Sequence, residues 1–319
     1  MKTLLKKTLV TAVAAATLTV GMVGTASAGA KAFSYMQITG LQIFNGNGDQ
    51  YDAADFDLLD ISDSSSTSAI TSVNGAALNN TLDATAGGGN LDDNVSCVGT
   101  GCAGFGEDNY VQQASPAAGT SFARSDTQLL GAVITDIGNG ILVNSATADA
   151  LAEGQTNVTD AGTATSKVGT ATDFSFSLLG DDTITFEFDA TAIMEVLLHQ
   201  DEFDTFASID FSITIRDLGL DASADPVFTF SPGALNTSIA QLVEGGPKVY
   251  TLPGGNPQPF SATTGLLSGA SNYQLTIAQG AFIDFDAQKV PEPASLALFA
   301  LGLLGVSAAR LSRKNKKLV

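Results

Sequence analysis

Apolar and polar residues alternate with a period of two along much of the second half of the chain. Residues 183–189 place one isoleucine and two phenylalanines on one side and polar groups on the other, and residues 208–216 repeat this pattern. Such alternation is typical of strands that have one face on a core and one in water. Shorter or less regular examples are residues 173–179, 227–230, 273–277 and 281–287.

Turn-forming residues separate these segments, as in residues 180–182 and 253–257. The pattern therefore predicts an all-β fold, an antiparallel β-sandwich or jelly roll that extends from about residue 170 to residue 290. The first half is less regular. Residues 32–44 predict an opening strand, whereas residues 62–106 are rich in Ser, Thr, Asn, Gly and Ala and indicate long loops.

The short apolar run at residues 194–198 fits either a helix or a strand, because such runs do not discriminate between the two. The chain shows no fixed-period repeat and no clean linker between two domains. We therefore expect one irregular β domain over residues 29–290.

The N-terminus has the layout of a secretory signal peptide. A basic start is followed by an apolar run over residues 8–23 and by a small-residue exit that contains Ala26 and Ala28. This order predicts Sec-dependent export and cleavage after Ala28, so that residues 1–28 are removed. The alternative is an N-terminal membrane helix that the protein keeps.

The C-terminus combines a proline-rich break, an apolar segment and a basic tail. Pro291 and Pro293 flank Glu292, and proline stops a preceding strand or helix. As a helix, the uncharged residues 294–309 extend about 24 Å at about 1.5 Å per residue, slightly short of the roughly 30 Å hydrocarbon core. Basic clusters stay on the cytoplasmic side of a membrane. One such cluster of five residues follows this segment: Arg310, Arg313, Lys314, Lys316 and Lys317. The physics alone leaves a permanent membrane anchor open.

Together, Pro291, Glu292 and Pro293, the transmembrane helix at residues 294–309 and the basic tail resemble the PEP-CTERM sorting signal of exported proteins. That signal occurs in Gram-negative bacteria that make extracellular polysaccharide. The resemblance covers residues 291–319 and implies recognition by an exosortase, a membrane-embedded cysteine protease and transpeptidase. It also implies cleavage near Pro-Glu-Pro, transient membrane anchoring, and release to the cell surface or extracellular matrix. The three residues are then a substrate site for another enzyme.

A second resemblance lies inside the body. Residues 106–112 (GEDNYVQ) and 122–126 (FARSD) are similar to the motif of the EDSAP subgroup of PEP-CTERM proteins. The match departs at Asn109 and Tyr110, where that motif has small residues. The subgroup implies no activity for this chain.

The exported part is strongly acidic. Three of the 14 Lys and Arg lie in the signal peptide and five in the tail, whereas 32 of the 33 Asp and Glu lie in the body. The body thus carries a formal charge of −26, compared with −19 for the whole chain. Such a field repels nucleic acids and anionic lipids, so the charge excludes nucleic-acid binding.

The two cysteines, Cys97 and Cys102, predict a disulfide in an oxidising compartment. A metal site would need further Cys or His ligands nearby, and the sequence has none there, so we expect no metal and no cofactor. His199 is the single histidine and has no nucleophile motif around it. Asn45, Asn47 and Asp49 place oxygen ligands at alternate positions, as a calcium loop needs, and acidic residues continue to Asp63. However, Gln50 and Phe56 stand where a calcium loop has Gly and Glu. A solvated acidic loop is the favoured interpretation.

Two classes of function remain. The first is a structural or adhesive surface protein without enzymatic activity, and the second is a polysaccharide-binding module or a glycan-acting hydrolase. Sugar sites usually present aromatic faces, but the chain has no Trp, five Tyr, and 18 Phe that fall mostly in strand patterns. The first class, a surface or matrix protein associated with exopolysaccharide and biofilm, is therefore favoured, and we expect extracellular polysaccharide among its partners.

Overall fold

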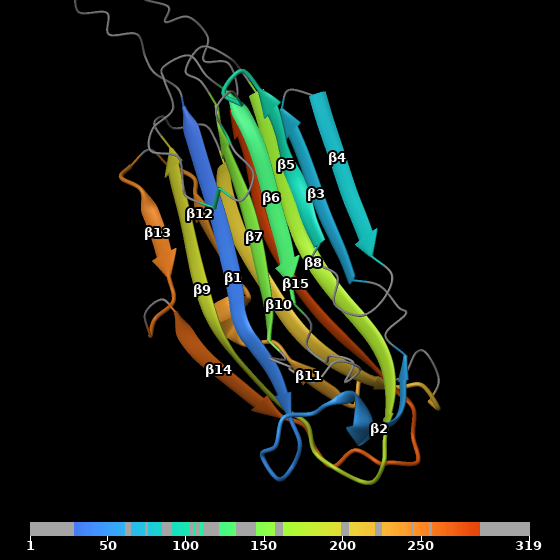
Figure 1. Ribbon diagram of the computed structural model, residues 1–319. Helices are drawn as coiled ribbons and strands as arrows, with labels where there is room; N and C mark the ends of the chain where they lie inside the picture. Colours follow the sequence, from blue (N-terminus) through green and yellow to red (C-terminus); the bar gives the residue numbers. More distant parts are fainter. Residues whose placement is uncertain are drawn as a thin grey trace, which may run out of the picture.

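The computed structural model describes residues 29–60, 65–73, 76–84, 91–102, 105, 109–110, 121–131, 145–156, 162–198, 204–220, 225–243, 245–254 and 257–287. Within these ranges the chain is a sandwich of two antiparallel sheets without an α-helix (Figure 1). The prediction of an all-β antiparallel sandwich is confirmed. The expected signal helix and C-terminal helix fall on residues outside the described ranges.

Sheet A has seven strands in the order β13-β9-β1-β7-β6-β5, with β14 also paired to β9. Its central strand is β1, which begins only two residues after the predicted signal-peptide cleavage site and pairs with β7 and β9. The bounds are β1 Ala30–Phe44, β5 Leu91–Gly99, β6 Phe122–Leu130, β7 Ala146–Gln155, β9 Thr185–Leu198, β13 Lys248–Thr251 and β14 Gln258–Thr263.

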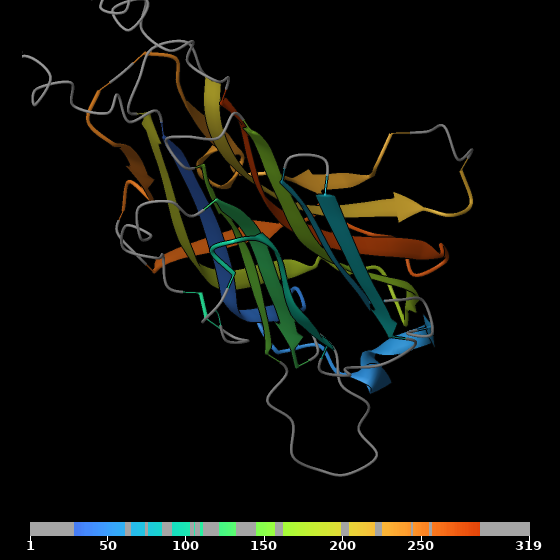
Figure 2. The ribbon, with the colours of Figure 1, turned by 90° about the horizontal axis from the view of Figure 1, so that it is seen from above.

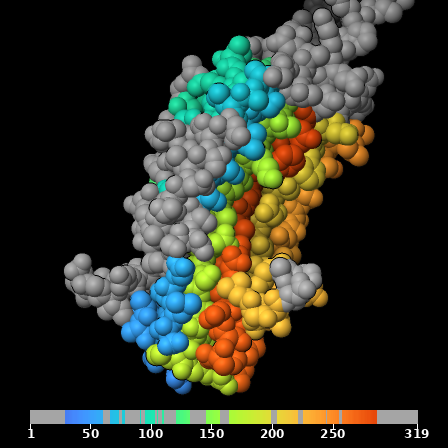
Figure 3. Space-filling model, turned by 90° about the vertical axis from the view of Figure 1, so that its right-hand side faces the viewer, coloured from blue at the N-terminus to red at the C-terminus, as the bar shows by residue number. Residues whose placement is uncertain are grey.

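Sheet B has eight strands in the order β11-β10-β15-β8-β3-β4, with β12 paired to β10 and β2 paired to β8. Figure 3 shows the face on which β8, β15 and β10 lie side by side. The bounds are β2 Phe56–Asp60, β3 Ser65–Val73, β4 Ala76–Ala84, β8 Gly162–Leu178, β10 Asp204–Asp217, β11 Phe228–Phe230, β12 Thr237–Gln241 and β15 Tyr273–Ala287. Two short 3₁₀ turns, η1 Ala53–Asp55 and η3 Gly233–Leu235, also occur.

The core lies between the sheets and follows the alternation of the sequence. In β9, Phe186, Phe188 and Met194 point inward and are buried, whereas Glu187 is exposed. The ambiguous run at residues 194–198 is the end of this strand. The segments 273–277 and 281–287 are one strand, β15, in which Gln279 occupies an inward position and interrupts the apolar pattern.

The expectation of long loops over residues 62–106 was wrong, because β3, β4 and β5 occupy most of it. In β3 the inward residues are Thr67, Ala69, Thr71 and Val73, all of them buried. Small and hydroxyl-bearing residues provide the inward face here, so the stretch lacks the large apolar residues that marked the later strands. The sandwich consequently includes both halves of the chain.

Small residues bring the two sheets close together in this region. The Ser166 hydroxyl on β8 donates to the backbone carbonyl of Arg124 on β6, at 2.8 Å. Likewise, Ser34 on β1 donates to the carbonyl of Ser208 on β10, at 2.7 Å. A side chain as short as serine reaches the backbone of the opposite sheet only because no large residue stands between them.

Both ends of the described body lie at the same end of the sandwich. Gly154 pairs with Ala32 near the start of β1, and a Cβ atom at Gly154 would lie 2.7 Å from Ile283 and 2.8 Å from Phe285, near the end of β15. The first and last strands thus begin and end together, at the top of Figure 1, and Figure 2 looks down on this end. We call it the terminal end.

Candidate functional site

Cys97 and Cys102 form a disulfide near the terminal end, which confirms the prediction. The Cα atoms are 5.7 Å apart, within the usual range for a disulfide. Gly99, between the two cysteines, has a φ of +118° and leaves no room for a Cβ, which would lie 2.2 Å from the Ser121 carbonyl oxygen. Glycine is required at this position because only it tolerates both the backbone angle and the close approach to β6.

Beside the disulfide, an ion pair is buried on the face of sheet A that points away from sheet B. Arg124 on β6 and Glu153 on β7 are register partners, and neither side chain is exposed. The Nε and Nη2 atoms of Arg124 both donate to Glu153 Oε2, at 2.8 and 2.7 Å. The outer face of a two-layer sandwich is ordinarily in water, so its complete burial here requires a covering segment.

Three described residues that follow the disulfide, Phe105, Asn109 and Tyr110, belong to this covering segment. The guanidinium Cζ of Arg124 lies 4.3 Å from the ring centre of Phe105, and Nη1 donates to the backbone carbonyl of Asn109 at 3.0 Å. Phe105 also packs on Phe122, with ring centres 5.0 Å apart. A cation–π contact and a charge-assisted hydrogen bond thus tie this segment to the sheet.

A second carboxylate, Asp149, extends the buried polar face along β7. Its Oδ1 accepts hydrogen bonds from the Tyr35 hydroxyl at 2.8 Å and from Gln37 Nε2 at 2.9 Å. Burial, followed by the proximity of Asp149, raises the pKa of Tyr35 above the ordinary value of a phenol. Tyr35 also contacts the ring of Tyr110, with centres 5.8 Å apart. We call Arg124, Glu153, Asp149, Tyr35 and Gln37 the covered polar cluster.

The acidic stretch at residues 45–60 forms a hydrogen-bonded turn at the end of the sandwich opposite the terminal end. Asn45 Oδ1 accepts from the backbone of Asn47 and Asp49, while Asp52 caps η1. The Tyr51 hydroxyl donates to Asp182 Oδ2 at 2.8 Å, and burial, followed by this hydrogen bond, raises the pKa of Tyr51. Across the described ranges, no group of three or more His, Cys, Asp or Glu side chains is arranged to hold a metal ion. The oxygens of Asn45 and Asp52 accept hydrogen bonds from the protein's own backbone donors.

A surface groove of about 370 Å³ lies beside a bulge in β1. The bulge arises where the register with β9 shifts between Thr39 and Gln42, around Gly40 with a φ of +67°. Polar side chains of Gln42, Glu187, Asp189 and Ser261 line the groove. It is an open polar surface, unlike the covered polar cluster.

The chain runs from β15 directly into its C-terminal segment. β15 ends at Ala287, and the family model of the PEP-CTERM protein-sorting motif matches residues 289–314. The chain carries a PEP-CTERM sorting motif. A search of the curated proteins and of the solved structures finds no match.

The motif indicates export, a cell-surface or extracellular location, and an exosortase as processing partner. Pro291, Glu292 and Pro293 lie within the matched residues but outside the described part of the structure, as do Ala26, Ala28 and His199. No helix of the described residues is long and apolar enough to cross a membrane.

The structure brings together residues from the two segments singled out in the body, residues 106–112 and 122–126. Asn109 and Tyr110, from the first segment, contact Arg124 and Tyr35 respectively, and Arg124 belongs to the second segment. The sequence did not predict Glu153 as the partner of Arg124 or Asp149 as the partner of Tyr35. A signal was present, since an arginine flanked by small residues within a strand-like segment requires an acidic partner when buried.

Proposed function

We propose that the body is a structural or adhesive component of the cell surface or extracellular matrix, delivered there after an exosortase removes the C-terminal signal. The observation that carries this proposal is the position of β15. It lies in the interior of sheet B, between β10 and β8, and ends at Ala287, before the matched motif begins at residue 289. Cleavage near Pro291–Pro293 would therefore leave every described strand intact, and the body would be released folded.

Transient membrane anchoring is part of the same proposal. Residues 294–309 are short for a lasting span, and the basic residues after them would keep the tail in the cytoplasm. Because β1 and β15 share the terminal end, Sec-dependent export followed by anchoring would hold the body with that end toward the membrane. The acidic turn at residues 45–60 would then point away from it.

We further propose that the body has no catalytic role of its own. The charged side chains of the covered polar cluster are buried. Arg124 is hydrogen-bonded to Glu153, and Asp149 accepts hydrogen bonds from Tyr35 and Gln37. Such an arrangement favours a stabilising role, since catalytic groups need access to a substrate. In this proposal, the sorting enzyme performs the chemistry that determines the protein's fate.

The proposed role is tested by deleting the gene in the exporting host and measuring surface attachment and cohesion of the cells. Loss of either property, restored by the wild type and not by a chain that lacks residues 291–319, supports the proposal. Unchanged attachment and cohesion in the deletion strain would contradict a structural or adhesive role.

A polysaccharide-binding module, or a glycan-acting hydrolase, is the second candidate, and the groove beside Gly40 is the observation in its favour. Glu187, Asp189, Gln42 and Ser261 offer hydrogen-bonding groups of the kind that bind sugar hydroxyls. A glycan array with the protein purified from its host separates the two candidates. Selective binding that is lost in Glu187→Gln would put the second candidate first, and hydrolysis of a bound glycan would identify it as an enzyme.

A further inference from the structure

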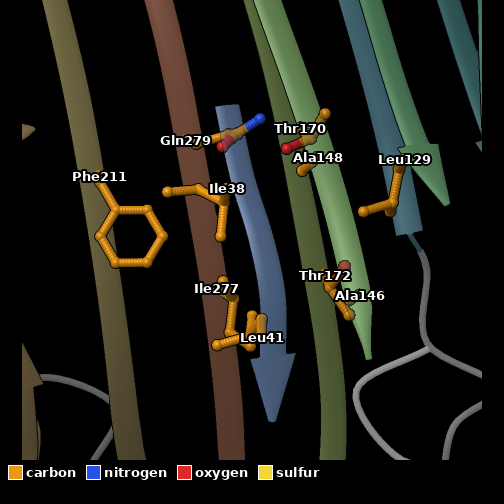
Figure 4. Close-up of a pocket in the computed structure, with 10 residues that line it drawn as sticks. All are labelled: Ile38, Leu41, Leu129, Ala146, Ala148, Thr170, Thr172, Phe211, Ile277 and Gln279. Carbon is orange, nitrogen blue, oxygen red and sulfur yellow. The ribbon is translucent and has the colours of Figure 1, made fainter. Parts of the chain in front are cut away.

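A cavity lies inside the sandwich, between facing rows of side chains from the two sheets (Figure 4). On sheet B, Phe211, Gln279 and Thr170 are register partners on three adjacent strands. On sheet A, Ile38, Ala148 and Leu129 form the corresponding row. The centre of a water molecule has about 20 Å³ to move in, more than the roughly 10–15 Å³ that holds one water.

The amide of Gln279 lines this cavity without a hydrogen bond. Its side chain is 5% exposed, and neither Nε2 nor Oε1 has a partner among the described residues. A buried polar group left unsatisfied costs about 1–3 kcal/mol, and native proteins rarely leave one so. An inward glutamine in a strand whose other inward residues are apolar or aromatic is thus a local exception to the design of the core.

The packing of the core is interrupted at the same place. Leu91, Leu129 and Ala148 form a small apolar cluster separate from the main core. The small side chain of Ala148 leaves space opposite Gln279 that a larger residue would fill. An unsatisfied amide and an underpacked wall therefore coincide, and both would favour a guest.

We propose that this cavity is a binding site for a small neutral molecule with an apolar body of a few carbons and one hydroxyl or amide head. The head pairs with Gln279, whose amide offers both a donor and an acceptor. The apolar walls contact the carbon body. A charged guest is disfavoured, because none of the described residues that line the cavity is charged and desolvating an ion is costly.

Cyclopentanol is a suitable probe, and cyclopentane, which lacks the hydroxyl, is the control compound. The protein purified from its exporting host is labelled at its methyl groups and titrated with each compound by NMR. Saturable shifts at the methyl groups of Ile38, Leu129 and Ile277, with tighter binding of cyclopentanol than of cyclopentane, are expected. An absence of such shifts, or a water on Gln279 that cyclopentanol fails to displace, would overturn the proposal.

Two substitutions separate the amide from the cavity. Gln279→Leu should weaken cyclopentanol binding about fivefold or more, the equivalent of one hydrogen bond, and should leave cyclopentane bound. Ala148→Leu should abolish binding of both by filling the space. Gln274→Leu, on the outer face of the same strand, is the control and should change neither. Equal binding of cyclopentanol by wild type and Gln279→Leu would contradict the role of the amide. If that variant does not fold, the comparison of cyclopentanol with cyclopentane on the wild type still tests this role.

Discussion

Arg124 and Glu153 face each other on adjacent strands and form an ion pair that is entirely removed from water, with Nη2 and Oε2 2.7 Å apart. Burying two charges is costly, and their mutual attraction offsets this only when the geometry is good and further hydrogen bonds are made. Arg124 makes those additional contacts with Asn109 and Phe105 of the covering segment. The pair therefore joins that segment to sheet A.

Breaking this pair should destabilise the protein strongly. Arg124→Met leaves Glu153 buried without its counterion, and we expect a loss of about 3–5 kcal/mol in the free energy of unfolding. The double variant Arg124→Met with Glu153→Leu should lose less than the single variant, because no buried charge remains. Urea unfolding of the wild type, the single variant and the double variant measures both values, and a double variant that loses as much as or more than the single variant would contradict the coupling.

Lys31 and Glu195 provide the matched control for that comparison. Their Nζ and Oε1 atoms are 3.9 Å apart, and both side chains keep some exposure to solvent, at 13% and 22%. A partly exposed pair of this kind contributes about 0–1 kcal/mol. Lys31→Met should therefore change the free energy of unfolding by less than about 1 kcal/mol.

The disulfide should be complete in the exported protein. Alkylation without reductant, followed by mass spectrometry, should modify neither Cys97 nor Cys102, and modification of both would contradict the link. Replacing both by serine should lower the free energy of unfolding by about 2 kcal/mol, since the closed loop is short. The same replacement should also make the Arg124 side chain less protected from solvent, because the covering segment follows directly after Cys102.

Close contact between the sheets predicts a steric effect at Gly154. A methyl group there would lie 2.7 Å from Ile283 Cδ1 and 2.8 Å from Phe285 Cε1, so Gly154→Ala should cost about 1–3 kcal/mol. Gly265→Ala is the control, since a Cβ there meets nothing within 4 Å. Thermal unfolding compares the two variants, and equal melting temperatures would argue against tight packing at Gly154.

The two buried phenols predict a loss of stability at high pH. The pKa values of Tyr35 and Tyr51 are raised in the folded protein, mainly by burial, whereas an unfolded tyrosine titrates near pH 10. Below about pH 10 both states hold these protons, so the contribution is constant. Above it the unfolded chain releases protons that the folded protein keeps, so the free energy of unfolding falls as pH rises. Tyr35→Phe and Tyr51→Phe should each reduce that slope in urea unfolding, and unchanged slopes would contradict the burial of these hydroxyls.

Local pattern predicted the strands whose inward residues are large. β9 and β10 alternate Phe, Ile and Val with polar residues, and the period of two is visible without knowledge of their partners. β3 and β7 were not predicted, because their inward faces consist, apart from Val73, of Thr, Ala and Gly, which also occur in loops. Ala150 and Ala152, for example, are fully buried, yet nothing local distinguishes them from exposed alanines.

The candidate sites likewise divide into those that the sequence predicted and those that required the structure. The disulfide followed from two cysteines in an exported chain, and the sorting motif from a contiguous run of residues. The Arg124–Glu153 pair depends on the register between β6 and β7 and on a segment folded over the outer face. Those relationships are set by strand pairing and tertiary packing, so they require the structure.

Exosortase cleavage near Pro291–Pro293 should remove the apolar segment and the basic tail from the mature protein. Because Glu292 is the charged centre of that motif, Glu292→Ala should leave the precursor uncleaved while the folded body, which ends its last strand at Ala287, is unchanged.

Intact-mass measurement of the protein from a host that contains the exosortase tests this claim most directly. The account predicts a mature chain that begins at Gly29 and ends near residues 291–293, with residues 310–319 absent. A mature protein that retains residues 310–319, in a host whose exosortase processes other substrates, would contradict it and support a permanent anchor.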